Sequence, residues 1–347
     1  MKLNRPFSFL FLSALLSVVL TANGGRAAGG GGEVVHREFE FTYQAHVPAN
    51  PEAKGAEKVW IPIPKSDAFQ DIRDLKIEST VKNTTGNEKE YGNTFVVFTP
   101  TAEQAAAGFD VAMKFNATRR EHKVALDGGN SQKTMSANDP ELQRYLQPDK
   151  LVPLNGTIAE LAKEHTAGDT TQIQKARHIY EYVVSTMRYD KTGDGWGRGD
   201  AVWACTSKRG NCTDFHSLFI GMMRSSGIPA RFEIGFPLPE GKTEGEIGGY
   251  HCWAEFYLDG IGWVPVDASE AWKNPKKHDY FFGAHDTNRV FFTYGRDIRL
   301  SAEQKGDPLN YFIYPYAEAN GQALKNVQTH FSFHDVAAGQ TSAANRP

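Results

Sequence analysis

The segment Lys208-Arg209-Gly210-Asn211-Cys212-Thr213-Asp214-Phe215-His216 decides the fold class of this chain, because it marks the start of a helix. Asn211 is a favoured N-cap residue, apolar side chains follow with helical spacing, and Gly227 predicts the end of the helix. Cys212 then lies in the first turn, where backbone N–H groups and the helix dipole favour a thiolate and could bind a developing oxyanion. The segment therefore predicts a reactive cysteine, although a single cysteine is more often a small buried side chain.

A second informative segment covers residues 250–257, where polar and apolar residues alternate. The alternation predicts a strand that carries His251 on one face. A turn at Leu258-Asp259-Gly260 joins it to a further short strand that ends at Asp267. The two strands are therefore expected to form a hairpin.

Two turn geometries are compatible with this hairpin. A two-residue loop at Asp259-Gly260 would set Cys252 opposite Asp267. A three-residue loop with a left-handed Gly260 would instead set His251 opposite Asp267. Opposed residues approach to roughly 4.5–5.5 Å between Cβ atoms, which lets a carboxylate hold an imidazole N–H. We favour the three-residue loop on that ground.

Cys212, His251 and Asp267 together have the side chains of a nucleophile, a base and an orienting carboxylate, in that order along the chain. Thiol-dependent acyl-transfer enzymes use this set, because the base takes the thiol proton and the carboxylate selects the tautomer of the base. Each residue alone also has a structural interpretation: a buried cysteine, a hydrogen-bonded histidine and a strand-end cap. The hypothesis depends on the three occurring together.

The chain has three cysteines, Cys205, Cys212 and Cys252, and an odd number leaves at least one thiol unpaired within an exported chain. Cys205 and Cys252 could form a disulfide and leave Cys212 free, but sequence does not give their distance. His216 shares a helix face with Cys212 and could be an alternative base; we interpret it as structural. The cysteine and histidine spacing fits no compact zinc pattern, so neither a metal nor a cofactor is expected.

These segments resemble the transglutaminase-like superfamily. The run Gly210-Asn211-Cys212, with Gly227-Ile228-Pro229-Ala230-Arg231 beyond it, is similar to the nucleophile helix of that family and its exit. The pattern His251-x-Trp253-x-Glu255, followed by Gly262-Trp263-Val264-Pro265-Val266-Asp267, is similar to its histidine and aspartate strands. The resemblance covers residues 180–270. It implies an α+β fold with a papain-like core, in which the nucleophile helix packs on an antiparallel sheet, and it maps the catalytic triad onto Cys212, His251 and Asp267. The calcium-binding insertions of the animal enzymes have no visible counterpart, so no calcium is implied.

The pattern along the chain predicts five parts. Residues 1–27 have the basic start, short apolar run and small residues of a cleaved signal peptide. Residues 28–33 are a glycine-rich spacer. Residues 34–140 alternate in short, proline-punctuated runs that predict a small antiparallel β domain. Residues 141–335 are expected to form the transglutaminase-like core with C-terminal strands, and residues 336–347 a disordered tail.

Composition and the predicted signal peptide limit the classes of function that this chain can have. The formal charge of −3 gives no reason to expect nucleic acid as a partner, and signal removal would leave no membrane anchor, so we expect a periplasmic or secreted protein. The expected function is an exported thiol acyl-transfer enzyme that acts on peptide or carboxamide groups of proteins or peptides, cell-wall peptides among them, through a thioester. Whether water or an amine resolves the thioester stays open. The alternative is a non-catalytic binding or scaffold module that retains the fold.

Overall fold

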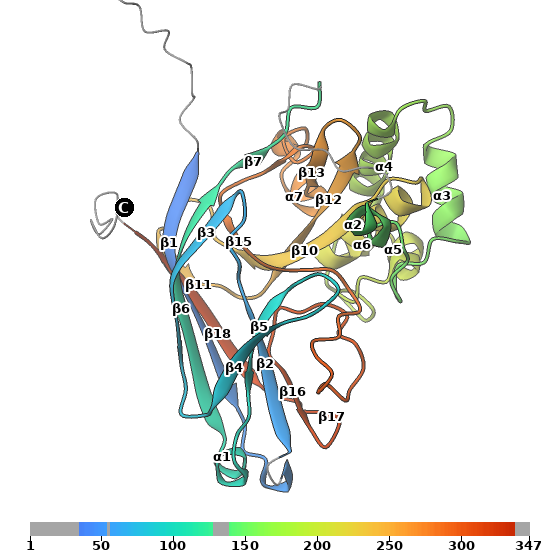
Figure 1. The fold of residues 1–347 in the computed structure, drawn as a ribbon. Helices are drawn as coiled ribbons and strands as arrows, with labels where there is room; N and C mark the ends of the chain where they lie inside the picture. Colours follow the sequence, from blue (N-terminus) through green and yellow to red (C-terminus); the bar gives the residue numbers. More distant parts are fainter. Residues whose placement is uncertain (1–34, 54–55, 128–138, 337–347) are drawn as a thin grey trace, which may run out of the picture. The chain divides into compact units, whose positions relative to one another are not determined.

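The computed structural model describes residues 35–53, 56–127 and 139–336. Most of its strands lie in two five-stranded sheets and one four-stranded sheet, here called sheets 1, 2 and 3 (Figure 1). In the described part of the chain, no helix is both long enough and apolar enough to cross a membrane. The expected signal peptide (1–27), the spacer (28–33) and the tail beyond residue 336 lie outside the described residues.

Sheet 1 has the strand order β11-β18-β1-β6-β3 and contains strands from both ends of the chain. At its centre, β1 and β6 form an antiparallel pair. Alternate side chains of β1, namely Phe39, Phe41 and Tyr43, are buried, as the alternating sequence pattern predicts. Its strands are β1 (His36–Val47), β3 (Gln70–Glu78), β6 (Phe109–Arg120), β11 (Glu244–Glu246) and β18 (Gln328–Asp335).

Sheet 2 has the order β17-β16-β2-β5-β4 and is covered by apolar side chains on both faces. Val59 and Ile61 belong to the main core, whereas Trp60 points into a smaller cluster with Ile298 and Phe312. Its strands are β2 (Glu57–Ile63), β4 (Asn83–Asn87), β5 (Thr94–Phe98), β16 (Tyr316–Ala319) and β17 (Gln322–Ala323), and two short helices, η1 (Pro51–Ala53) and α1 (Ala102–Ala107), lie in the same part of the chain.

Sheet 3 has the order β13-β12-β10-β15 and carries the helix that begins at Cys212. That helix, α6 (Cys212–Ser225), packs on the sheet, with the Phe219 ring 6.0 Å from the Phe256 ring. The strands are β10 (Ala230–Pro237), β12 (His251–Leu258), β13 (Gly262–Val266) and β15 (Arg289–Tyr294). Around them lie α2 (Pro140–Arg144), α3 (Thr157–His165), α4 (Gln172–Thr186), α5 (Ala201–Ser207), α7 (Ala268–Lys273), η2 (Pro275–Lys277), and two strand pairs, β7 (His122–Lys123) with β14 (Ala284–His285) and β8 (Arg188–Tyr189) with β9 (Arg209–Gly210).

This arrangement confirms the predicted α+β class: a nucleophile helix on an antiparallel sheet, preceded along the chain by an all-β region. The helix limits are also close to those predicted. Asn211 is the N-cap of α6, and Gly227 has a φ of 77° just beyond its end. Helix α4 has Thr171 as its N-cap, with a capping box formed by Gln174.

One apolar core runs from sheet 1 into sheet 3. The Phe41 ring in β1 lies 5.3 Å from the ring of Phe236 in β10 and 5.9 Å from that of Phe292 in β15. The described residues from Val35 on accordingly form one compact unit. The division of the sequence into segments 34–140 and 141–335 stays a prediction, because this core is shared by both.

The loop of the β12–β13 hairpin has three residues, Asp259 to Ile261, and Gly260 is left-handed with a φ of 78°. Both features agree with the favoured turn. The register does not: Tyr257 pairs with Trp263 and not with Ile261, which is a shift of two residues. The prediction that His251 stands directly opposite Asp267 is therefore wrong.

The shift nevertheless keeps His251 and Asp267 on one face, because side chains alternate with a period of two. Asp267 is now a diagonal neighbour of His251, which is still within reach of these side chains. Strand β13 ends at Val266, and Asp267 leaves the ladder as the N-cap of α7, with φ −134° and ψ 83°. This turn brings its carboxylate to the imidazole.

Candidate active site

Cys212 is the first residue of α6, and a capping box holds the backbone around it. The Asn211 side chain accepts a hydrogen bond from the Thr213 N–H at 2.9 Å, and the Asp214 carboxylate accepts one from the Asn211 N–H at 2.9 Å. Asp214 also accepts hydrogen bonds from two N–H groups of the preceding glycine-rich loop. Asp214 thus caps the start of α6 and holds the preceding loop against it.

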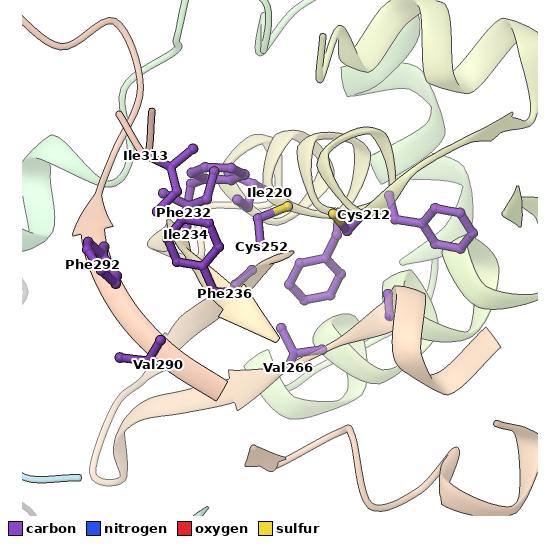
Figure 2. Close-up of a cluster of buried hydrophobic side chains, with 14 of the residues drawn as sticks. Cys212, Ile220, Phe232, Ile234, Phe236, Cys252, Val266, Val290, Phe292 and Ile313 are labelled. Atoms are coloured by element: carbon purple, nitrogen blue, oxygen red, sulfur yellow. The ribbon is translucent and has the colours of Figure 1, made fainter. Parts of the chain in front are cut away.

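The thiol of Cys212 is almost fully buried, with 2% of the residue exposed. Burial alone would raise its pKa, but hydrogen bonds from Cys252 and His251 and the charge of His251 outweigh burial and hold the pKa well below its ordinary value. Figure 2 shows the sulfur atoms of Cys212 and Cys252 turned toward each other beside α6. These contacts favour the thiolate form of Cys212.

The N–H groups expected to be free at the start of α6 have partners in this structure. The Cys212 N–H donates to the Tyr189 hydroxyl, and the Thr213 N–H donates to Asn211. A developing oxyanion at this place would therefore have to replace the Tyr189 hydroxyl as the acceptor of the Cys212 N–H.

His251 connects the thiol to the carboxylate. Its Nε2 lies 2.7 Å from Oδ2 of Asp267, which leaves Nδ1 for the hydrogen bond with Cys212. Burial lowers the pKa of His251, but the charge and hydrogen bond of Asp267 and the hydrogen bond with Cys212 raise it to about 10. The structure therefore brings the three predicted site residues together: Cys212 contacts His251, and the Asp267 carboxylate holds the other nitrogen of that ring.

Asp267 is completely buried and every oxygen of its carboxylate has a donor. Oδ2 accepts from His251 and, at 3.1 Å, from Nη1 of Arg289. Oδ1 accepts from the Ser269 hydroxyl at 3.1 Å and from the Glu270 N–H at 3.0 Å. Burial raises the pKa of Asp267, but His251 and Arg289 hold it well below its ordinary value. The residue is thus both the cap of α7 and the partner of His251.

Sequence reasoning missed Arg289. Its guanidinium is buried, lies over the Trp253 ring at 4.8 Å from the ring centre, and is shared between Asp267 and Asp286. No local motif marks this arginine, because it reaches the site from β15. It supplies a permanent positive charge that keeps Asp267 ionised.

Sequence reasoning also left the place of Cys252 open. The three cysteines are free and buried, so the disulfide considered between Cys205 and Cys252 is not formed. Cys252 instead lies beside the nucleophile, with its Sγ 3.7 Å from Oγ1 of Thr213, and its own pKa is raised well above the usual value by burial and by Cys212. It forms a hydrogen bond with Cys212 that favours the thiolate form of Cys212.

His216 has a structural place, as interpreted from the sequence. Its Nδ1 lies 2.8 Å from the Cys212 carbonyl oxygen, and its Nε2 accepts from the Ala268 N–H at 3.2 Å. Nε2 is also 3.6 Å from Oδ1 of Asp267, too long for a hydrogen bond. Burial lowers the pKa of His216, which keeps it neutral. It joins the start of α6 to the start of α7.

We expect the substitution Cys252→Ala to slow alkylation of Cys212 by iodoacetamide about 10-fold at pH 6, because the thiolate loses a hydrogen-bond donor and its pKa rises. Cys252→Ser keeps a donor at the same place and should alkylate at close to the parent rate. Equal rates for the alanine variant and the parent would show that the Cys252 thiol does not stabilise the thiolate.

Comparisons with known proteins identify the family of this chain. Residues 159–268, which include all three site residues, match the family model of the transglutaminase-like superfamily. An uncharacterized protein of Haemophilus influenzae is 30% identical over 325 residues, which cover 83% of this chain and 87% of that protein. The uncharacterized protein YebA of Bacillus subtilis is 28% identical over 148 residues, 38% of this chain and 20% of that protein.

The fold has a counterpart among solved structures. A crystal structure from Cytophaga hutchinsonii, described as that of a candidate cysteine protease, matches with a TM-score of 0.60 at 14% identity and covers 88% of this chain and 92% of that one. This likeness shows the fold alone. The family match and the full-length relative together show that the chain belongs to the transglutaminase-like superfamily.

Proposed function

We propose that this chain is an exported thiol acyl-transfer enzyme that acts on peptide or carboxamide groups, with Cys212 as nucleophile, His251 as acid and base, and Asp267 as the orienting carboxylate. The observation that carries the proposal is the contact of a cysteine at a helix start with a histidine whose other ring nitrogen is held by a buried carboxylate. A cysteine, a histidine and an aspartate with purely structural roles would have no reason to form this chain of contacts.

In the proposed reaction, Sγ of Cys212 attacks the carbonyl carbon and forms a C–S bond. The C–N bond then breaks, and Nδ1 of His251 gives its proton to the leaving amine, which produces a thioester and a neutral imidazole. The imidazole next takes a proton from water or from an amine, whose attack on the thioester releases Cys212. Asp267 stays ionised throughout and holds the orientation of His251.

The pH dependence of two rates tests this assignment. Alkylation of Cys212 by iodoacetamide should already be at its plateau at pH 7, since the pKa of the thiol is lowered well below its ordinary value. Turnover, in contrast, should fall as the pH rises through about 10, where His251 loses its proton. An ordinary thiol would react faster as the pH approaches about 8.5. An alkylation rate that climbs more than about 10-fold between pH 7 and 9 would remove the main support for the proposal.

Hydrolysis and transfer use the same triad, so a partition experiment separates them. The acyl-enzyme can be formed from a p-nitrophenyl ester or a glutamine peptide and then resolved with and without a primary amine. Amide product would identify a transferase, and free acid in the presence of amine would identify a peptidase or amidase. An exported location makes proteins and cell-wall peptides the first substrates to test.

The second candidate function is a binding or scaffold module that keeps the fold without turnover. Such a module needs no lowered thiol pKa and would form no acyl-enzyme. Mass spectrometry after exposure to the ester therefore decides between the two: a single acyl adduct on Cys212 supports the enzyme, and its absence supports the module.

A further inference from the structure

Three buried side chains with metal-ligating atoms meet outside the Cys212 site. They are His122 in β7, Glu255 in β12 and His285 in β14, and one ligand atom of each lies within 4.8 Å of the other two. His122 and His285 are direct partners across the β7–β14 pair, and Glu255 contributes from the adjoining sheet 3. Nδ1 of His122 is 3.1 Å from Oε1 of Glu255.

The hydrogen bonding of this cluster is incomplete. Within the described residues, neither ring nitrogen of His285 has a hydrogen-bond partner, and Nε2 of His122 has none either. His285 is fully buried and His122 is 3% exposed. An unsatisfied polar atom in a protein interior is destabilising, so these nitrogens require an explanation, and a bound ion would give a partner to one nitrogen of each imidazole.

We propose that His122, Glu255 and His285 form a zinc site, distinct from the Cys212 site. Two imidazoles and one carboxylate are a donor set that zinc prefers. Calcium and magnesium would need several oxygen ligands, and this cluster offers one carboxylate. Tetrahedral zinc places its ligand atoms about 3.3 Å apart. Side-chain movements of about 1 Å would bring the three ligand atoms to that spacing.

The surroundings of the three side chains leave space for a fourth zinc ligand. A cavity of about 260 Å³ is lined by His122 and Glu255, which leaves room for water as the fourth ligand. Burial and the charge of Arg289 hold the pKa of His285 well below its usual value. Burial raises the pKa of Glu255, but Arg231 and His122 hold it well below its ordinary value.

Two of the three arginines near the cluster are paired with carboxylates, and the third, Arg119, is buried in the wall of the same cavity. Arg231 donates from Nε to Oε2 of Glu255 at 2.8 Å, which leaves Oε1 facing His122. Arg289, whose charge also acts on His285, is held by Asp267 and Asp286. A zinc ion would therefore leave these ion pairs of Arg231 and Arg289 in place, and would have to separate only Nδ1 of His122 from Oε1 of Glu255.

Trp253 separates the proposed zinc site from the triad. Its ring lies 5.7 Å from the His251 ring on one side and 5.8 Å from the His285 ring on the other. Zinc would thus not touch the reacting atoms. It would join β7, which follows the long strand β6 of sheet 1, to β12, which carries His251, and so stabilise the attachment of the all-β region to sheet 3.

The test uses the full chain, freed of metal by a chelator and titrated with zinc chloride. It is run in the Cys212→Ala background, which removes the thiolate that would compete for zinc. We expect one zinc per chain, an X-ray absorption spectrum with only nitrogen and oxygen ligands, and a rise in melting temperature of about 5 °C at 100-fold excess over the Kd. No binding at micromolar zinc, or a sulfur ligand at about 2.3 Å, would overturn the proposal.

Three variants locate the zinc. His285→Phe should abolish zinc uptake while the metal-free protein melts at or above the parent temperature, because phenylalanine removes two unsatisfied nitrogens from the core. His122→Gln should also abolish uptake and serves if the first variant does not fold. His330→Gln is the matched control, since His330 forms an exposed histidine–glutamate pair with Glu246. Undiminished zinc uptake by either His285→Phe or His122→Gln would place the metal elsewhere. None of these measurements depends on acyl transfer.

Discussion

Substitution of Cys212 with alanine is expected to lower turnover by about 10⁶-fold, the loss seen when the nucleophile of a catalytic triad is removed. The reason is that no other group at the site can replace the thiolate. The Cys252 thiol is adjacent, but its burial raises its pKa and so disfavours the thiolate form. The acyl adduct that the parent forms from a p-nitrophenyl ester should also be absent from the variant, as measured by mass spectrometry of the intact chain.

A matched control is Cys205→Ala. Cys205 is also a free, buried cysteine, and burial raises the pKa of its thiol. Its loss should leave the rate and the adduct unchanged within about 2-fold. Retention of the adduct in Cys212→Ala, at Cys205 or Cys252, would mean that the nucleophile has been assigned to the wrong cysteine.

Substitution of Asp267 with asparagine is expected to lower kcat by about 10⁴-fold. An amide keeps the shape of the side chain but removes the charge that raises the pKa of His251 to about 10. The amide could also present an N–H toward His251 and select the wrong tautomer. The pH at which turnover falls on the alkaline side should therefore move down from about 10, which a purely structural role for Asp267 would not cause.

Ser269→Ala is the control for Asp267→Asn, because it removes one hydrogen bond to Oδ1 and leaves the contact of Oδ2 with His251 intact. We expect a loss of less than about 10-fold. Circular dichroism and melting temperature establish that both variants fold. If Asp267→Asn folded and kept kcat within 10-fold of the parent, His251 would not need a charged partner, and the triad would reduce to a Cys–His pair.

The local elements of the site were predictable because their signals lie within a few residues of one another. The N-cap at Asn211, the position of Cys212 in the first turn and the left-handed Gly260 all depend on backbone preferences of neighbouring residues. The hairpin register was wrong by two residues because a three-residue loop can be placed in more than one way around the same glycine. A shift of two residues leaves each side chain on the same face of the strand, so His251 and Asp267 still lie within reach of each other.

Other parts of the site were beyond sequence reasoning because they depend on long-range packing. Arg289 contacts Asp267 from the start of β15, 22 residues further along the chain, and no sequence motif predicts that contact. Cys252 was considered as a disulfide partner of Cys205, whereas the packing of α6 on β12 sets it beside Cys212. In each case the deciding quantity was a distance between elements, which composition and spacing do not contain.

By itself, the sequence determined the helix that begins at Cys212, the hairpin that carries His251 and precedes Asp267, and the family to which the chain belongs. Only the tertiary structure decided the ionisation of the site, since the charges of His251, Asp267 and Arg289 act through contacts between separate elements. It alone also brought together His122, Glu255 and His285, which no local spacing connects. The physical reason is the same for both: hydrogen bonding and charge interactions act over a few ångströms in space, and chain folding sets those distances.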